Sequence, residues 1–129
     1  MSKRSVVLTI VSLTALALLA LGSPAFAKDG DVLVRGICTG KSASKLKLSE
    51  ENGRIEVEFE VDQNKSGQKW RVKLKDNSEV VFRGTAATKG PSGSFSIERR
   101  ITDRAGSDAV KGVARNKSTD ERCTASATT

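Results

Sequence analysis

The feature that most constrains the fold is a strict alternation of apolar and charged residues, which recurs in three separate segments. It runs through residues 45–48 (KLKL), 55–61 (IEVEFEV) and 70–75 (WRVKLK). Because a β-strand points successive side chains to opposite faces, each segment can bury an apolar row and expose a charged one. We therefore expect strands with one buried and one solvated face, as in antiparallel sheets.

Turn signals separate these segments and mark further strands. Gly, Asn, Asp, Ser and Pro cluster at residues 51–53, 65–67, 76–78, 89–91, 104–106 and 116–118. They delimit additional strands at 32–38, 79–84, 94–99, 109–115 and 122–127, and no segment has a helical period. Seven or eight short antiparallel strands of this kind predict an all-β protein with the architecture of a β-sandwich.

The first 27 residues have the organisation of a secretory signal peptide. Lys3 and Arg4 form a basic start, residues 6–21 are almost wholly apolar, and Ala25 and Ala27 form an A-x-A cleavage site. The apolar stretch is shorter than the about 20 residues that a membrane-spanning helix needs. We expect cleavage after Ala27, secretion, and a single domain over residues 28–129 without a membrane span.

The two cysteines are expected to pair as Cys38–Cys123. Exported proteins fold in an oxidising environment, where an even number of cysteines indicates disulfide bonding. Residues 28–129 hold few large apolar side chains, so the core needs reinforcement, and a bridge closing this loop contributes about 4–5 kcal/mol. Two free buried thiols are the alternative.

The chain contains no histidine and no tyrosine, which excludes several kinds of active site. A Ser-His-Asp triad, a Cys-His dyad and histidine-ligated zinc or haem sites are impossible. The glutamates of 55–61 lie on an exposed strand beside lysines, which offers no cleft for acid catalysis. Asp103 and Asp108 are assigned to a turn in preference to a calcium site. We expect no enzyme, no cofactor and no metal.

The charged rows give two hypotheses for strand pairing. In the first, Lys45 faces Glu58 and Lys47 faces Glu56 across an antiparallel pair. The second requires 55–61 and 70–75 to be hairpin partners, and it pairs Glu60, Glu58 and Glu56 with Arg71, Lys73 and Lys75. Either ladder would set the strand register and keep the face solvated.

Residues 53–77 (GRIEVEFEVDQNKSGQKWRVKLKDN) resemble strands B and C of an immunoglobulin-like or fibronectin-III-like sandwich, in which an alternating B strand leads to a Trp-bearing C strand. Residues 107–116 (SDAVKGVARN) and 121–128 (ERCTASAT) resemble strands F and G. The whole chain resembles uncharacterised small exported bacterial β-sandwich proteins with one disulfide. The resemblance implies that strands B and C lie in different sheets, that Trp70 is in the core, and that the bridge holds the N-terminal strand beside strand G.

The positive charge is the main indication of a partner. The net charge of +7 falls to +5 without Lys3 and Arg4, and most of the excess lies after residue 80. In an immunoglobulin-like topology, loops 62–68, 86–93 and 116–120 meet at one end and bring Lys65, Lys89 and Lys117 together. The basic residues of the second half are Arg83, Lys89, Arg99, Arg100, Arg104, Lys111, Arg115, Lys117 and Arg122.

The leading hypothesis is an exported, non-catalytic binding module that recognises an anionic cell-envelope polymer or another protein through these basic loops, or through the basic second half. The alternative is a small-ligand carrier or secreted enzyme inhibitor on the same sandwich. A third interpretation is that the charge only keeps an exported protein soluble. Because the chain has few aromatic residues for base stacking, we expect no sequence-specific recognition of nucleic acid.

Overall fold

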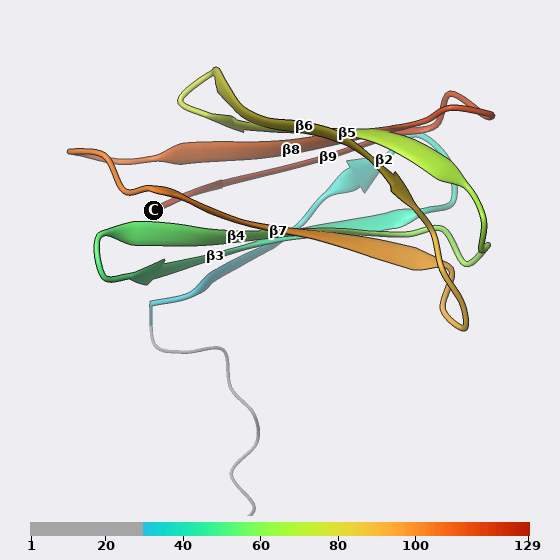
Figure 1. Cartoon of the computed structure of the whole chain (residues 1–129), viewed down its shortest axis with the longest axis horizontal. Coiled ribbons are helices and arrows are strands. Elements are labelled where there is room, and N and C mark those ends of the chain that lie inside the picture. The colour runs from blue at the N-terminus through green and yellow to red at the C-terminus, as the bar shows by residue number, and fades with distance from the viewer. Residues whose placement is uncertain (1–29) are drawn as a thin grey trace, which may run out of the picture.

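A computed structural model describes residues 30–129 as two antiparallel β-sheets packed face to face (Figure 1). One sheet has the strand order β1-β3-β4-β7 and the other the order β2-β9-β8-β5-β6, so the predicted all-β sandwich is confirmed. The strands are β1 (Val32–Arg35), β2 (Ile37–Cys38), β3 (Ala43–Glu51), β4 (Arg54–Asp62), β5 (Lys69–Asp76), β6 (Glu79–Ala87), β7 (Ser94–Thr102), β8 (Ala109–Asn116) and β9 (Arg122–Thr128).

The predicted signal peptide and its cleavage site at Ala25 and Ala27 lie outside the described residues. Within residues 30–129, no helix is long and apolar enough to cross a membrane.

Apolar side chains that alternate inward along the strands hold the two sheets together. Phe59 and Trp70 are the largest of them, and both are fully buried, as are Leu46 and Leu74. The ring centroids of Trp70 and Phe95 lie 6.1 Å apart, so the prediction of a core tryptophan is confirmed. Each large apolar side chain buried in this way contributes about 1.5–3 kcal/mol to folding.

Segment 32–38 forms two strands instead of the single one expected, which raises the total to nine in place of seven or eight. β1 pairs with β3 in the four-stranded sheet, whereas β2 pairs with β9 in the five-stranded sheet. At Gly36, between them, a Cβ atom would collide with the Ser44 hydroxyl and the Thr124 carbonyl oxygen. The chain can cross from one sheet to the other because glycine permits this close approach.

The predicted register of Lys45 with Glu58 is wrong by two residues. β3 and β4 are joined by a two-residue turn at Asn52 and Gly53, whose φ angles are 53° and 72°. A turn with positive φ at both positions is the type that fits the twist of a hairpin, and it fixes the pairing of the two strands. Lys45 consequently faces Glu60, and Lys47 faces Glu58.

The second pairing hypothesis is also wrong, because β4 and β5 lie in different sheets. The glutamates of β4 therefore cannot face the basic residues of β5. This separation is the one that the resemblance to an immunoglobulin-like sandwich implied.

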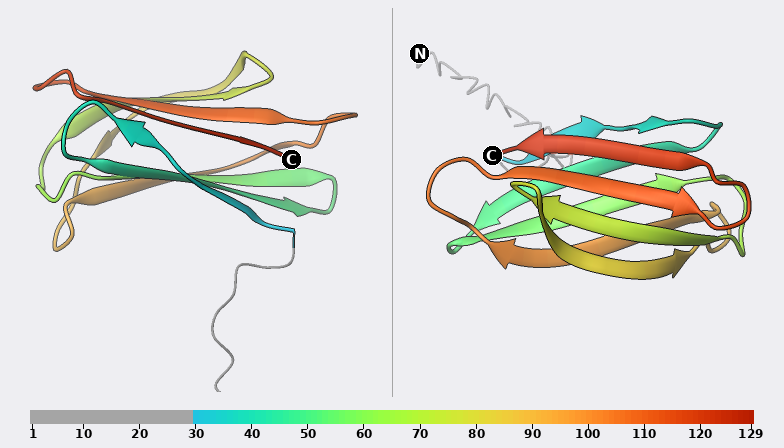
Figure 2. Two further views of the ribbon diagram at one scale, coloured as in Figure 1. Left: turned by 180° about the vertical axis from the view of Figure 1, so that it is seen from behind. Right: turned by 90° about the horizontal axis from the view of Figure 1, so that it is seen from above.

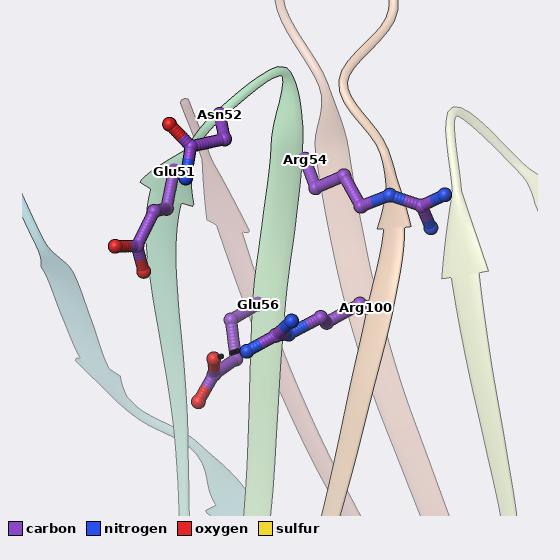
Figure 3. A pocket seen from close by; sticks show the side chains of 5 residues that line it. All are labelled: Glu51, Asn52, Arg54, Glu56 and Arg100. Atoms are coloured by element: carbon purple, nitrogen blue, oxygen red, sulfur yellow. Dashed lines mark ion pairs between the residues drawn. The ribbon is translucent and has the colours of Figure 1, made fainter.

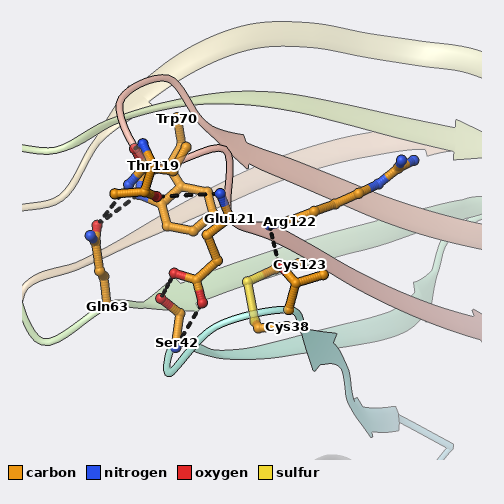
Figure 4. Close-up of a disulfide and its surroundings, with 10 residues drawn as sticks. Cys38, Ser42, Gln63, Trp70, Thr119, Glu121, Arg122 and Cys123 are labelled. Atoms are coloured by element: carbon orange, nitrogen blue, oxygen red, sulfur yellow. Dashed lines mark hydrogen bonds between the residues drawn. A yellow bond between two sulfur atoms is a disulfide. The ribbon is translucent and has the colours of Figure 1, made fainter.

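The Cys38–Cys123 disulfide is present and joins directly opposed residues of β2 and β9. Figure 4 shows that the neighbouring Glu121 carboxylate holds the loop before β3. It accepts hydrogen bonds from the Ser42 backbone N–H at 3.0 Å and from the Ser42 hydroxyl at 2.6 Å. The bridge and this carboxylate together attach the N-terminal segment to the last strand.

Substitution of both cysteines, Cys38→Ala/Cys123→Ala, should lower the free energy of unfolding by about 2–5 kcal/mol, since the long loop is then open in the unfolded chain. Urea denaturation followed by tryptophan fluorescence would measure the change. Wild-type protein reduced with dithiothreitol is the control and should show a similar loss. A double variant as stable as the oxidised wild type would contradict this expectation.

Gly112 on β8 lies against the Phe59 ring, and a Cβ atom there would come within 2.7 Å of ring carbons. Gly112→Ala should therefore destabilise the protein by about 1–3 kcal/mol through overpacking. Lys111→Ala, the neighbouring exposed position, is the control and should change stability by less than about 0.5 kcal/mol. Equal denaturation midpoints for the two variants would show that the ring can move aside.

Candidate anion-binding face

The outer face of the five-stranded sheet carries basic side chains from four strands. Side chains alternate along each strand, so the residues between the buried ones all project from this face, which Figure 2 (right) shows from above. No outward position on this face of β5, β6, β8 or β9 holds a carboxylate. We call this surface the basic sheet face, and its basic residues are Lys69, Arg71, Lys73, Lys75, Arg83, Lys111, Arg115 and Arg122.

Strand register arranges these side chains in rows that run across the strands. In one row Arg71 on β5 faces Arg115 on β8, which in turn faces Arg122 on β9. In the next row Lys73 faces Arg83 on β6. Neighbouring strands are about 4.8 Å apart, so cations in a row are closely spaced. A third row pairs Lys75 with Lys111.

A shallow hollow of about 550 Å³ lies between these rows. Besides the basic side chains, Thr85 and Val113 line it. The exposed side chain of Ile37 lies on β2 at the end of the Val113 row, opposite Thr124. The hollow therefore offers positive charge and the Thr85 hydroxyl beside the apolar side chain of Val113.

The positive charges of the face repel one another. The pKa of Lys73 is lowered, first by the charge of Arg83 opposite it, then by burial and by the charges of Lys75 and Arg122. Among residues 30–129, no ion pair joins Arg71, Arg83 or Arg122 to a carboxylate. A bound anion would relieve this repulsion.

The outer face of the four-stranded sheet has a different charge pattern, because acidic and basic residues face each other. Lys45 Nζ lies 3.4 Å from Glu60 Oε2, and Arg100 Nε lies 3.7 Å from Glu56 Oε2. Figure 3 shows the second pair in a hollow of about 320 Å³ that Glu51 also lines. Glu58 also faces Glu98 across β4 and β7, so this face carries acidic as well as basic groups and has little preference for an anion.

The loops that carry Lys65, Lys89 and Lys117 meet at one end of the sandwich. Gly67 N–H donates to the Thr88 carbonyl at 2.7 Å, which joins the first two loops. Lys117 N–H donates to the Lys69 carbonyl at 2.9 Å, so Lys117 adjoins the basic sheet face. All three lysines are exposed. Their role in binding remains a prediction.

The basic sheet face was not predicted from the distribution of charge between the two halves of the sequence. β5 belongs to the first half of the chain, yet it supplies half of the basic residues of this face. Three arginines counted in the second half are engaged elsewhere: Arg99 stacks 4.2 Å from the Phe82 ring centre, Arg100 pairs with Glu56, and Arg104 pairs with Glu79. Assigning β5, β6, β8 and β9 to one sheet, with outward alternation, would have found the face.

The end of the sandwich opposite the loops of Lys65, Lys89 and Lys117 holds a carboxylate cluster. Asp76 and Asp108 are buried, and Arg104 Nε lies 3.5 Å from Asp76 Oδ2. Asp108 Oδ2 accepts the Arg104 backbone N–H at 3.2 Å, so this aspartate organises the β7–β8 turn. Burial raises the pKa of Asp76, and the nearby Asp108 raises it further. Burial also raises the pKa of Asp103, with Asp108 adding to the shift.

One group of three potential metal ligands lies within 4.8 Å among residues 30–129, namely Cys38, Glu121 and Cys123. The two sulfur atoms are bonded to each other in the disulfide, and the Glu121 carboxylate is engaged with Ser42. This group therefore has a structural role.

No protein-family model and no curated protein matches the sequence. One solved structure, that of chicken MD-1 complexed with lipid IVa, is similar over 72% of this chain and 95% of that chain. The sequence identity is 11% and the TM-score is 0.29. A likeness of this extent says nothing about the ligand or activity of this chain.

The buried carboxyl of Asp76 should make stability depend on pH. A carboxyl group whose pKa is raised by folding stabilises the protein below its pKa in the unfolded chain, which is about 3.9. This contribution is lost as the pH rises through the pKa of the group in the folded protein. Asp76→Asn mimics the protonated group, so the variant should lose less stability than wild type between pH 4 and 7. Urea denaturation at several pH values would test this.

Glu98→Gln is the control, because it removes one exposed carboxylate and so changes the net charge by the same amount as Asp76→Asn. It should retain the wild-type pH profile. If Asp76→Asn retained that profile too, Asp76 would not be the group responsible.

Proposed function

We propose that this protein is a non-catalytic module that binds a linear anionic polymer on the basic sheet face. The observation that supports this most strongly is the collection of eight basic side chains on one sheet face without an outward carboxylate. Charge concentrated on one surface attracts polyanions and accelerates their association. The partner class is the one expected from the sequence, but we place its site on strands in addition to loops.

The shape of the face favours an extended polymer. The basic residues lie in successive rows on a sheet, so one chain could contact several of them at once. Aromatic rings are absent from the face: Phe59, Trp70 and Phe95 are buried, and Phe82 lies beneath Arg99. Without exposed rings to stack on bases or sugars, recognition rests on charge.

We also propose that the sandwich is immunoglobulin-like and that the protein is exported. The order β9-β8-β5-β6 supports the first proposal, because the strand that resembles F lies between those that resemble C and G. The disulfide supports the second, since such bonds persist in oxidising compartments.

A small-ligand carrier is less well supported than a polymer-binding module. Carriers hold their ligand in an interior cavity. Here the space between the sheets is filled by apolar side chains, and those of Phe59, Trp70 and Leu46 have no exposed surface. The outer face is therefore the better site for a ligand.

The test is a salt titration of the oxidised protein against immobilised dextran sulfate and polyphosphate. The logarithm of the wild-type affinity should fall linearly with the logarithm of the salt concentration, because binding releases counterions from the polymer. Arg71→Glu/Lys73→Glu/Arg83→Glu should weaken binding by about tenfold or more at low salt, since three contacts become repulsive.

Two matched variants change the net charge by the same amount. Arg35→Glu/Arg54→Glu/Arg100→Glu alters exposed positions on β1, β4 and β7 of the other sheet and should retain most of the affinity. Lys65→Glu/Lys89→Glu/Lys117→Glu tests the loop end. If the loop variant lost binding while the face variant retained it, the loops would be the site. No binding by wild type at low salt would overturn the proposal altogether.

A further inference from the structure

The arginine row of the basic sheet face has features of a specific subsite. Arg71, Arg115 and Arg122 lie on three adjacent hydrogen-bonded strands and face one another directly. Like charges in opposed positions destabilise a sheet. An anion held between two of these guanidinium groups would remove that repulsion.

A second hollow, of about 330 Å³, lies on the loop side of this row. Arg71, Arg115 and Lys117 line it, together with Asn116 and Asp120. The larger hollow of the face is also lined by Arg71 and Arg115, so this pair of arginines is accessible from both sides. Three cations of the row and the adjoining turn thus surround one small space.

One carboxylate enters this space. Asp120 Oδ1 lies 3.2 Å from Arg115 Nη2, and both side chains are largely exposed. Asp120 belongs to the β8–β9 turn, where its φ is 61° and its N–H donates to the Asn116 carbonyl at 3.0 Å. The Asp120 carboxylate therefore occupies the position that an incoming anion would take on Arg115.

We propose that Arg71, Arg115 and Lys117 form a subsite for a sulfate or phosphate ester group of the polymer, and that Asp120 competes with this group for Arg115. This inference rests on the proposed function and specifies its ligand. A single guanidinium fork engages both oxygens of a carboxylate. An ester oxyanion with three terminal oxygens has an acceptor left for the neighbouring arginine, which suits two guanidinium groups side by side.

Replacement of the competing carboxylate provides the test. Asp120→Asn should raise the affinity for dextran sulfate and dextran phosphate about two- to fivefold, the range expected for loss of an exposed ion pair. The plot of log affinity against log salt concentration should also become steeper, by the amount expected for about one additional contact, because Arg115 becomes available. Asparagine tolerates the left-handed backbone at this position, so the turn should be retained.

Glu98→Gln is the matched control, since it removes one carboxylate from the outer face of the other sheet. It should leave the affinity and the salt dependence unchanged. An equal gain in the two variants would show that only net charge matters, and it would overturn the role of Asp120.

Arg115→Lys tests the chemistry of the ligand, because it keeps the charge and removes the fork. It should weaken binding of dextran sulfate and dextran phosphate, whose monoester groups have three terminal oxygens, more than binding of polygalacturonate, a polymer of carboxylates. The two ester polymers distinguish sulfate from phosphate as the preferred group. If wild type bound polygalacturonate as tightly as both, the ester subsite would be wrong.

These results separate the two proposals. If Arg71→Glu/Lys73→Glu/Arg83→Glu abolished binding while Asp120→Asn had no effect, the basic sheet face would stand and the subsite would fall. Binding to vesicles of anionic lipid without binding to any soluble polymer would overturn both.

Discussion

Burial of one row of side chains on each strand is the constraint on which the rest of this structure depends. Strand side chains alternate between two faces, so the register that packs Phe59, Trp70 and Leu74 between the sheets also determines which residues face water. A shift of one residue would bury a row of charges and expose the core. The charged faces are therefore a direct consequence of core packing, and strand register determines which cations are neighbours.

The same constraint gives the two outer faces opposite electrostatic character. In the four-stranded sheet β4 presents glutamates between strands that carry lysine and arginine, so Lys45 and Arg100 find partners within the protein. In the five-stranded sheet the adjacent strands β5 and β8 both present basic residues, and within residues 30–129 the one ion pair that these residues form is that of Arg115 with Asp120. Repulsion among these cations opposes folding slightly. An anion bound between them would replace this repulsion with a net attraction. This difference between faces is the physical basis for proposing a polyanion partner.

Much of the fold was predictable from local sequence. The alternating segments became β3, β4 and β5, the turn signals fell between strands, and Trp70 and the disulfide were placed correctly. The errors arose where a local signal was given too little weight. Asn52-Gly53 specifies a two-residue turn that fixes the β3–β4 register, whereas matching opposite charges gave a register two residues away. Gly36 divides the first strand because only glycine permits the close approach of the chain at that point.

The sequence by itself determined the strand class, the inward and outward sides of each strand, and the pairing of its two cysteines, because these depend on side-chain period and on counting. Which strands become neighbours depends on contacts between residues far apart in the chain, and only the tertiary structure decided it. Arg71 and Arg122 are separated by most of the domain in sequence, yet both face Arg115 across adjacent strands. The basic sheet face exists because of this assembly, so no count of charge along the chain could locate it.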